Sequence, residues 1–290
     1  MLKTPFTPAS NGRLTEYLER AAAAIPPSSA RQPALKTMWD ASKGLRVGVD
    51  LGTAYLMLAV LDADGQPVAG EWQPAQVARD GLVVDFIGAV DRLLGMKQRV
   101  EKRLGRALTH AASGYPPGVP PGEVQATANL IESAGLECSG LIDEPSAANN
   151  LLGLRQGAIV DVGGGTTGIA VLQDGEVVYT TDEATGGTHF SLVIAGALNL
   201  SLEQAEALKT DPAEQERLFP LVRPVMEKVA SITSRHLRGY RIPEIVLVGG
   251  SAAFPGFASV LQQATGIPTR ATPRPMYITP LGIALHCPLN

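Results

Sequence analysis

Two short stretches of the chain have an aspartate near the end of an apolar run, directly before a glycine turn. The first is Val49-Asp50-Leu51-Gly52-Thr53, and the second is Val160-Asp161-Val162-Gly163-Gly164. Glycine turns let backbone N–H groups approach phosphate oxygens closely, because no side chain stands in the way. A carboxylate repels phosphate, but it can hold Mg²⁺ through water, and the ion can bridge to the phosphates. Together the two stretches predict binding of a nucleotide with magnesium.

The two stretches belong to a longer repeat. With a constant offset of 111 residues, Ala59-Val60-Leu61 aligns with Ala170-Val171-Leu172 without a gap, and an Asp-Gly hairpin signal follows in each block. Each block has the pattern strand, aspartate, glycine turn, strand, hairpin and strand. A single Asp-x-Gly turn usually marks only a hairpin. Two in register indicate a duplicated lobe with a nucleotide cleft between the copies.

Composition excludes several other classes of protein. The 290 residues are 45% hydrophobic and 18% charged, with a formal net charge of −4 and scattered basic residues, so neither a nucleic-acid nor a membrane partner is expected. The two cysteines form no CxxC pair, and the four histidines lack ligand spacing, which disfavours zinc, iron–sulfur and disulfide frameworks. No signal-peptide pattern and no apolar run of about 20 residues is found, so a cytoplasmic location is expected.

The first 43 residues differ from the rest in being rich in proline, serine and alanine. Leu14, Leu18, Ala21 and Ile25 predict one apolar helix face, which Pro26 and Pro27 end. This extension (1–43) could pack on the body or dock a partner; packing is favoured because so short a helix is marginal alone. We expect a first lobe at 44–147, completed by a C-terminal helix at 279–290. A second lobe at 148–278 would carry a small nucleotide-covering subdomain.

Strands and helices alternate after residue 44, which predicts a mixed α/β fold. Strands are expected at 45–51, 54–61, 66–69, 108–113, 137–143, 158–162, 167–172, 176–181 and 244–249. Helices are expected at 86–104, 123–133, 188–198, 202–208, 213–238, 255–264 and 280–286.

Five motifs in order resemble the actin/Hsp70/sugar-kinase superfamily. Val47–Thr53 is similar to its first phosphate loop, Ile159–Thr167 to its second, and Ile245–Ser251 to its adenosine motif. Asp143–Ala148 and Pro280–Ala284 are similar to its two connecting helices. The resemblance implies a duplicated, two-lobe ATPase fold of the ribonuclease H-like kind, with ATP or ADP and Mg²⁺ in the central cleft.

Three further segments narrow the resemblance to the ethanolamine utilization protein EutJ family. They are Arg79–Phe86, Thr109–Ala112 with Pro116-Pro117-Gly118, and Asp182–Gly187. That family is encoded with bacterial microcompartments. It implies a chaperone-like protein whose client is ethanolamine ammonia-lyase or a component of the microcompartment shell, and whose location is associated with that compartment.

The superfamily resemblance also implies roles for individual residues. Glu144 would position the attacking water, and this role is favoured over the alternative of a carboxylate at a helix start. Glu206 and Lys209 would contact the ribose, although a solvated i,i+3 ion pair is equally consistent. The remaining roles are Mg²⁺ held through water by Asp50 and Asp161, phosphate contacts from Gly52, Thr53, Ala54, Gly163, Gly164, Gly165, Thr166 and Thr167, close backbone approach at Gly186 and Gly187, and adenine contacts from Gly249, Gly250 and Ser251.

Two departures from the Hsp70 pattern predict slow hydrolysis. The first lobe has no clear counterpart of the phosphate-contacting lysine, and the arginine that stacks on adenine is replaced by Ala253. Two other functions of the same fold stay open, a filament-forming relative of MreB and FtsA and a small-molecule kinase. A kinase would need a carboxylate that activates the acceptor, and none is identifiable.

Overall fold

The computed structural model describes residues 11–30, 40, 43–75, 78–79 and 82–289. The chain divides into two compact units: unit 1 is Met1–Gly153 with Tyr277–Asn290, and unit 2 is Leu154–Met276. Most of the predicted extension outside its helix, and Asp80-Gly81 of the Arg79–Phe86 segment, lie outside the described residues. Each unit is built on a five-stranded sheet, as the alternating strands and helices of the sequence predict.

The sheet of unit 1 has the strand order β3-β2-β1-β6-β7. The first three strands form an antiparallel meander, whereas β6 and β7 run parallel to β1. A separate short hairpin pairs β4 with β5. The strands are β1 (Arg46–Leu51), β2 (Tyr55–Leu61), β3 (Pro67–Pro74), β4 (Ala78–Arg79), β5 (Leu82–Val83), β6 (His110–Tyr115) and β7 (Glu137–Asp143).

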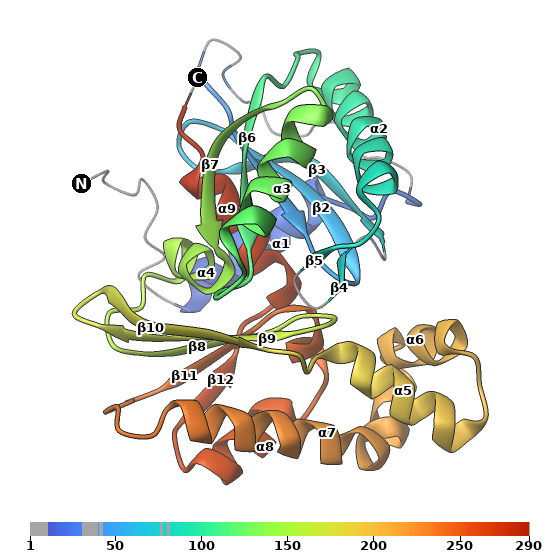
Figure 1. The fold of residues 1–290 in the computed structure, drawn as a ribbon, viewed down its shortest axis with the longest axis vertical. Coiled ribbons are helices and arrows are strands. Elements are labelled where there is room, and N and C mark those ends of the chain that lie inside the picture. The colour runs from blue at the N-terminus through green and yellow to red at the C-terminus, as the bar shows by residue number, and fades with distance from the viewer. Residues whose placement is uncertain (1–10, 31–39, 41–42, 76–77, 80–81, 290) are drawn as a thin grey trace. The chain divides into compact units, whose positions relative to one another are not determined.

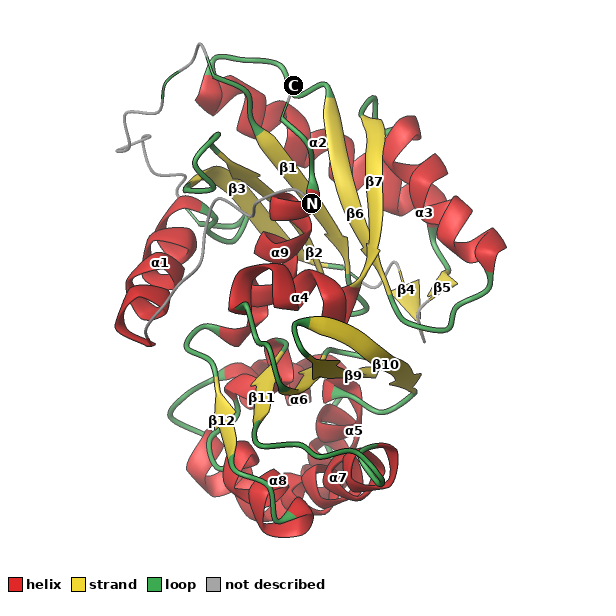
Figure 2. Cartoon of the chain, turned by 90° about the vertical axis from the view of Figure 1, so that its left-hand side faces the viewer, coloured by secondary structure: helices red, strands yellow, loops and turns green. Residues whose placement is uncertain are grey.

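Helices cover both faces of this sheet. On one face, α2 (Phe86–Leu104) packs against β2 and β3, and α3 (Pro121–Ser133) packs against β6 and β7 (Figure 1). On the other face, α4 (Glu144–Leu152) and α9 (Ile278–His286) lie side by side (Figure 2). Gly48 allows α9 to approach, because a Cβ there would lie 2.5 Å from the backbone nitrogen of Ala284.

The N-terminal helix α1 (Asn11–Ala24) belongs to the body of unit 1. The four residues of its predicted apolar face are all buried, and the Tyr17 hydroxyl donates to the Gly65 carbonyl at 2.8 Å. After the helix, the backbone pairs with Trp72 of β3, which receives a hydrogen bond from Ser28 N at 2.7 Å. The Tyr277 hydroxyl donates to the Ile25 carbonyl at 3.1 Å. The described part of the extension therefore packs against β3, the edge strand of the sheet.

Unit 2 repeats the topology, with the strand order β10-β9-β8-β11-β12. Its strands are β8 (Gly157–Val162), β9 (Thr167–Gln173), β10 (Glu176–Glu183), β11 (Ile245–Val248) and β12 (Thr269–Ala271), and its helices are α5 (Gly187–Leu198), α6 (Leu202–Thr210), α7 (Gln215–His236) and α8 (Phe257–Thr265). The helices α5, α7 and α8 pack on one face of the sheet around Phe190 and Phe257 (Figure 1). Within the described chain, none of the helices has the length and apolar character of a membrane span.

The two sheets agree in register as well as in order. Asp50 pairs with Met57 in unit 1, and Asp161 pairs with Gly168 in unit 2, so both the aspartates and their partners keep the spacing of 111 residues. In each unit the aspartate is the next-to-last residue of its strand, before the turn into the antiparallel neighbour. The duplication predicted from sequence is therefore present in the hydrogen-bonded pairing itself.

A buried ion pair anchors β3 to α2 and to the residues after α1. Glu71 is fully buried and accepts from Arg99 Nε and from Ser28 Oγ, both at 2.9 Å. We predict that Glu71→Gln lowers the free energy of unfolding of unit 1 by about 2 kcal/mol, because it removes the charge from buried hydrogen bonds. The measurement is urea unfolding followed by tryptophan fluorescence, since both tryptophans, Trp39 and Trp72, belong to unit 1.

The matched control is Asp64→Asn, which alters an exposed and long ion pair with Lys43 in the same unit. It should change the free energy of unfolding by less than about 0.5 kcal/mol. Equal effects of the two substitutions would mean that the Glu71 pair does not anchor the N-terminal segment.

Candidate functional site

The first candidate element is the turn between β1 and β2 in unit 1. Asp50 and Leu51 end β1, and the predicted phosphate-contacting residues Gly52, Thr53 and Ala54 form the turn. All of them are partly exposed. A Cβ on Gly52 would lie 2.8 Å from the carbonyl oxygen of Tyr55, so the tight turn requires glycine there. The turn thus presents its backbone, two small side chains and the Asp50 carboxylate.

Glu144 lies at the same edge of this sheet. It begins α4 immediately after β7, and Asp143 caps the helix by accepting from Ser146 N at 3.0 Å. Because β1, β6 and β7 are parallel, their carboxyl ends lie at the same edge of the sheet. The ends of β1 and β7 are two strand spacings apart, which is about 10 Å. Gly114 of β6 lets Ile283 of α9 approach, since a Cβ there would lie 2.6 Å from Ile283 Cδ1, and Glu144 Cγ lies next to the same position at 3.4 Å. Unit 1 therefore brings Asp50 and Glu144 to one edge, as expected for a shared site.

Unit 2 builds the second element around the turn between β8 and β9. Gly163 N donates to the Thr166 carbonyl at 3.0 Å, which closes the turn. Three groups from elsewhere donate to the carbonyl oxygens of Gly163 and Gly164: Gly187 N at 2.9 Å, Thr188 N at 2.7 Å and Ser251 Oγ at 2.8 Å. Segments far apart in the sequence thus converge on one glycine turn.

The direction of these hydrogen bonds orients the turn. In a trans peptide the carbonyl and the N–H point in opposite directions. The Gly163 carbonyl faces α5 and Ser251, and the Gly164 carbonyl faces α5. The amides of the next residues, Gly164 and Gly165, therefore point away from α5. Successive amides of this kind form a concave anion site. The arrangement fits a phosphate group.

Glycine is needed where the backbones meet. A Cβ on Gly186 would lie 2.8 Å from the carbonyl oxygens of both Gly163 and Gly164. Gly249 has a left-handed φ of 87°, and a Cβ there would fill the space beside the Asp161 carboxylate. Asp161 is only 7% exposed. The glycines therefore let backbone segments pack directly against one another and against one buried carboxylate.

Glu206 and Lys209 are tied to this turn. Lys209 Nζ lies 2.6 Å from Glu206 Oε2 and donates to the Gly187 carbonyl at 3.1 Å, while Ser191 Oγ donates to the same carboxylate at 2.5 Å. Burial lowers the pKa of Lys209, and the Glu206 charge acts in the opposite direction. Both residues lie on α6 and hydrogen-bond to α5, so the pair differs from the solvated surface pair that the spacing alone allowed.

A second polar cluster supports the loop before α5, and sequence reasoning missed it. Glu183, the last residue of β10, receives hydrogen bonds from Arg235 Nη2 at 2.5 Å and from His236 Nε2 at 2.6 Å. The His236 hydrogen bond lowers the pKa of Glu183, and Arg235 adds to that effect. Tyr179 holds the other ring nitrogen of His236 at 2.7 Å. The cluster fixes the end of β10, from which the chain runs to Gly186 and Gly187.

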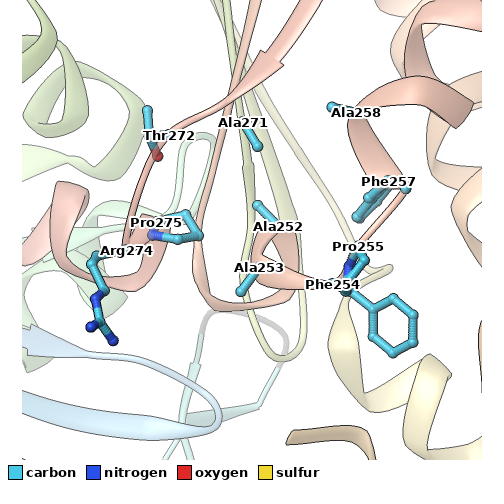
Figure 3. Close-up of a pocket in the computed structure, with 11 residues that line it drawn as sticks. Ala252, Ala253, Phe254, Pro255, Phe257, Ala258, Ala271, Thr272, Arg274 and Pro275 are labelled. Atoms are coloured by element: carbon cyan, nitrogen blue, oxygen red, sulfur yellow. The ribbon is translucent and has the colours of Figure 1, made fainter. Parts of the chain in front are cut away.

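A hollow of about 350 Å³ lies where β11 and β12 end, next to the Gly249-Gly250-Ser251 segment (Figure 3). The residues that line it are small or apolar, apart from Thr272 and Arg274. In Figure 3 the Arg274 side chain extends away from Ala258 and Ala271. Ala253, which replaces the adenine-stacking arginine of the Hsp70 pattern, is one of the lining residues. The remaining lining residues are Ala252, Phe254, Pro255, Gly256, Phe257, Ala258, Ala271 and Pro275. A flat, apolar ring matches this surface better than a charged group does.

The described geometry thus gathers the predicted residues into two sets. Unit 1 brings together Asp50, the turn after it and Glu144. Unit 2 brings together Asp161, the Gly163–Thr167 turn and the residues around them. These are Gly186-Gly187, the α6 residues Glu206 and Lys209, and Gly249–Ser251. The sequence offered no signal for the Glu183 cluster. Glu183 is 52 residues from Arg235 and 53 from His236, and such a separation forms no recognisable motif.

Comparison with known proteins gives one consistent fold. Family models match at residues 147–274 for "Type IV pilus assembly protein PilM" and at 72–203 for "MreB/Mbl protein". "Ethanolamine utilization protein EutJ" of Escherichia coli (strain K12) is 44% identical over 83% of this chain and 85% of its own length. The protein of that name from Salmonella typhimurium is 43% identical with the same coverage.

Solved structures agree. The crystal structure of ethanolamine utilization protein EutJ from Carboxydothermus hydrogenoformans has a TM-score of 0.85 and 40% identity, covering 95% of this chain and 99% of that one. MreB 5 of Spiroplasma citri bound to AMPPNP has a TM-score of 0.67 and 17% identity, covering 82% and 94%. At that identity the likeness to MreB shows the fold alone. The predicted actin/Hsp70-like, two-lobe ATPase fold is confirmed.

The close approach at Gly186 gives a direct test of the unit 2 geometry. We predict that Gly186→Ala lowers the free energy of unfolding by about 2 kcal/mol, because the new Cβ meets backbone atoms that no side-chain rotation can move. The control is Gly196→Ala in α5, where a Cβ would meet no atom within 4 Å. It should be neutral or stabilise by up to about 1 kcal/mol. Urea unfolding followed by circular dichroism measures both; equal stability of the two variants would contradict the packing.

Proposed function

Because the chain belongs to the ethanolamine utilization protein EutJ family, we propose that it serves ethanolamine utilization as a chaperone-like, ATP-binding protein with slow ATPase activity. The observation that carries the nucleotide proposal is the convergence of Gly187, Thr188 and Ser251 on the carbonyl oxygens of the Gly163 turn, beside the buried Asp161. Lys209 is joined to this arrangement through the Gly187 carbonyl. The MreB 5 structures of the same fold hold AMPPNP or ADP, which supports a nucleotide as the ligand.

The phosphates would bind to the two glycine turns. The amides of Gly164 and Gly165 point away from α5 and would donate to phosphate oxygens, and the turn from Gly52 to Ala54 would do the same from unit 1. The hydroxyls of Thr53 and Thr166 would be further donors, whereas the buried Thr167 hydroxyl already donates to the Thr185 carbonyl, contrary to the phosphate contact predicted for it.

The residues present fit magnesium. The ion prefers oxygen ligands and keeps several waters, and Asp161 offers a buried carboxylate that the Gly249 backbone can approach only because it has no Cβ. Asp50, the equivalent residue of unit 1, offers a second carboxylate. When bound, magnesium would offset the phosphate charge that these carboxylates otherwise repel. Asp50 and Asp161 would hold its water shell in position.

The base would lie at the ends of β11 and β12. Gly249, Gly250 and Ser251 lead from the Gly163 turn toward the hollow of Figure 3. Glu206 and Lys209, which bond to Ser191 and Gly187 of α5, would contact the ribose. Alanine at position 253 offers only apolar contact to the base, whereas an arginine would stack on it. We therefore expect the phosphates and magnesium to supply most of the affinity.

Glu144 is the proposed water-positioning residue. It is a partly exposed carboxylate at the edge of the sheet where β1 also ends, so it could accept a hydrogen bond from a water near the phosphates. Hydrolysis should be slow, because unit 1 lacks a clear phosphate-contacting lysine. Slow turnover suits a protein whose bound nucleotide selects between conformations with different affinity for a client. Ethanolamine ammonia-lyase and the microcompartment shell proteins are the proposed clients.

The likeness to MreB favours one alternative, a filament of this chain that forms with ATP. Sedimentation with ATP and magnesium distinguishes the two functions. A chaperone-like protein stays in the supernatant, whereas a filament pellets.

Asp161 gives the sharpest test of the site. We predict that Asp161→Asn weakens ATP binding in the presence of magnesium by about 100-fold, because the amide keeps the shape but loses the charge that orients the ion's water shell. Calorimetry measures the affinity. The control is Asp174→Asn at the exposed β9–β10 hairpin, whose left-handed φ of 53° asparagine tolerates. The control should bind as the parent protein does; unchanged affinity of Asp161→Asn would remove the proposal.

Glu144 is tested by separating binding from turnover. Glu144→Gln should leave the ATP dissociation constant within about threefold and slow phosphate release by about 100-fold, the usual contribution of a positioned acid or base. Glu123→Gln is the control, because Glu123 also lies in the first turn of a helix of unit 1. If both variants turn over equally, Glu144 acts only as a helix-start carboxylate.

A further inference from the structure

Arg274, in the loop after β12, has a backbone conformation that arginine rarely adopts. Its φ is 44°, and within the described chain only two other non-glycine residues have a positive φ, Asp174 and Asn199. The short side chains of aspartate and asparagine tolerate this left-handed region. Both residues also have a structural reason for it, since Asp174 lies in the β9–β10 hairpin turn and Asn199 ends α5. Neither reason applies to Arg274.

The segment around Arg274 is fastened on both sides. Thr272 N donates to the Leu247 carbonyl at 3.1 Å, and Gly249 N donates to the Pro275 carbonyl at 3.2 Å. Arg274 lies between two prolines, and a residue before proline normally has an extended backbone with a negative φ. The contacts on either side therefore impose the unusual backbone, and they fix the point from which the arginine side chain starts.

That point is the wall of the hollow where β11 and β12 end. Arg274 and Ala253 both line the hollow, and Figure 3 shows them at the end away from Ala258 and Ala271. Among the described residues that line the hollow, Arg274 alone carries a charge. Its side chain is exposed and has several rotatable bonds, so the guanidinium can reach a ring that fills the hollow.

The shape of the loop alone does not call for arginine. Glycine or asparagine would adopt the same left-handed φ with less strain. Strained backbone of this kind occurs preferentially at ligand sites, where the surrounding structure holds a particular side chain in place. The guanidinium beside the hollow is thus the feature of position 274 that the loop does not explain.

We propose that Arg274 stacks on the nucleobase in this hollow, in place of the arginine that the Hsp70 pattern has at position 253. The inference rests on the proposed function, because it requires a nucleotide on unit 2. A guanidinium is planar and stacks on the face of an aromatic ring. Stacking of this kind does not read the edge of the ring, so adenine and guanine are held alike.

Calorimetry with magnesium tests the inference with three ligands: ATP, GTP and tripolyphosphate, which has the phosphates but no base. Arg274→Asn should weaken binding of ATP and GTP by about tenfold each, the usual contribution of a stacked arginine. Binding of tripolyphosphate should stay within about twofold. Because asparagine tolerates the left-handed backbone, the midpoint of urea unfolding should not fall, which shows that the fold is kept.

Two further variants make the result specific. Arg241→Asn removes the same charge from an exposed arginine before the start of β11, at the other end of that strand from the hollow, and it should bind all three ligands as the parent protein does. Adding Ala253→Arg to Arg274→Asn should restore ATP affinity to within about threefold of the parent value, because both positions line the hollow.

The outcomes separate this inference from the proposed function. A parent protein that binds none of the three ligands contradicts the proposed function and the inference with it. If the parent protein binds ATP and Arg274→Asn binds it equally well, only the inference is overturned. An equal loss of tripolyphosphate binding overturns it too, since Arg274 would then act on the phosphates, and so does a double variant that fails to recover.

Discussion

The hydrogen bonds to the carbonyl oxygens of Gly163 and Gly164 are the interaction on which the rest of unit 2 depends. They come from the first turn of α5 and from Ser251, so they join the glycine turn, the helix and the loop after β11 in one place. Because they occupy the carbonyl side of the peptides, the amide side is left to a ligand. The contact is possible only without side chains, which is why Gly186 cannot gain a Cβ.

The duplication explains what the two units share and where they differ. Both place an aspartate at the same register position before a turn, so each offers one carboxylate and a set of backbone amides. Unit 2 surrounds its turn with α5, α6 and the loop after β11, whereas unit 1 adds Glu144 at the end of a parallel strand. The repeated turn therefore has different neighbours in the two units. In phosphoryl chemistry the protein mainly positions groups and offsets charge.

Much of this could be predicted from sequence because the signals are local. The repeat, the Asp-Gly turns and the 3.6-residue spacing of the helices are all visible within short windows, and the chain follows them. The three-residue strand β12 was not predicted, since it is too short for any periodicity. The Glu183 cluster, the contact of Lys209 with Gly187 and the hydrogen bond from Arg103 of α2 to the Ala24 carbonyl of α1 join residues 22 to 79 positions apart without a repeating pattern. The apolar residues of α5 predicted a helix, but periodicity could not tell which of them are buried.

The central claim is that this fold holds a nucleotide mainly through its phosphates and magnesium. The most direct measurement is calorimetry of the full chain with ATP, ADP and GTP, each with and without magnesium. The account predicts that ATP and ADP bind with magnesium and lose most of their affinity without it, and that GTP binds nearly as well as ATP because Ala253 offers no stacking group. Absence of binding by all three nucleotides in the presence of magnesium would contradict it.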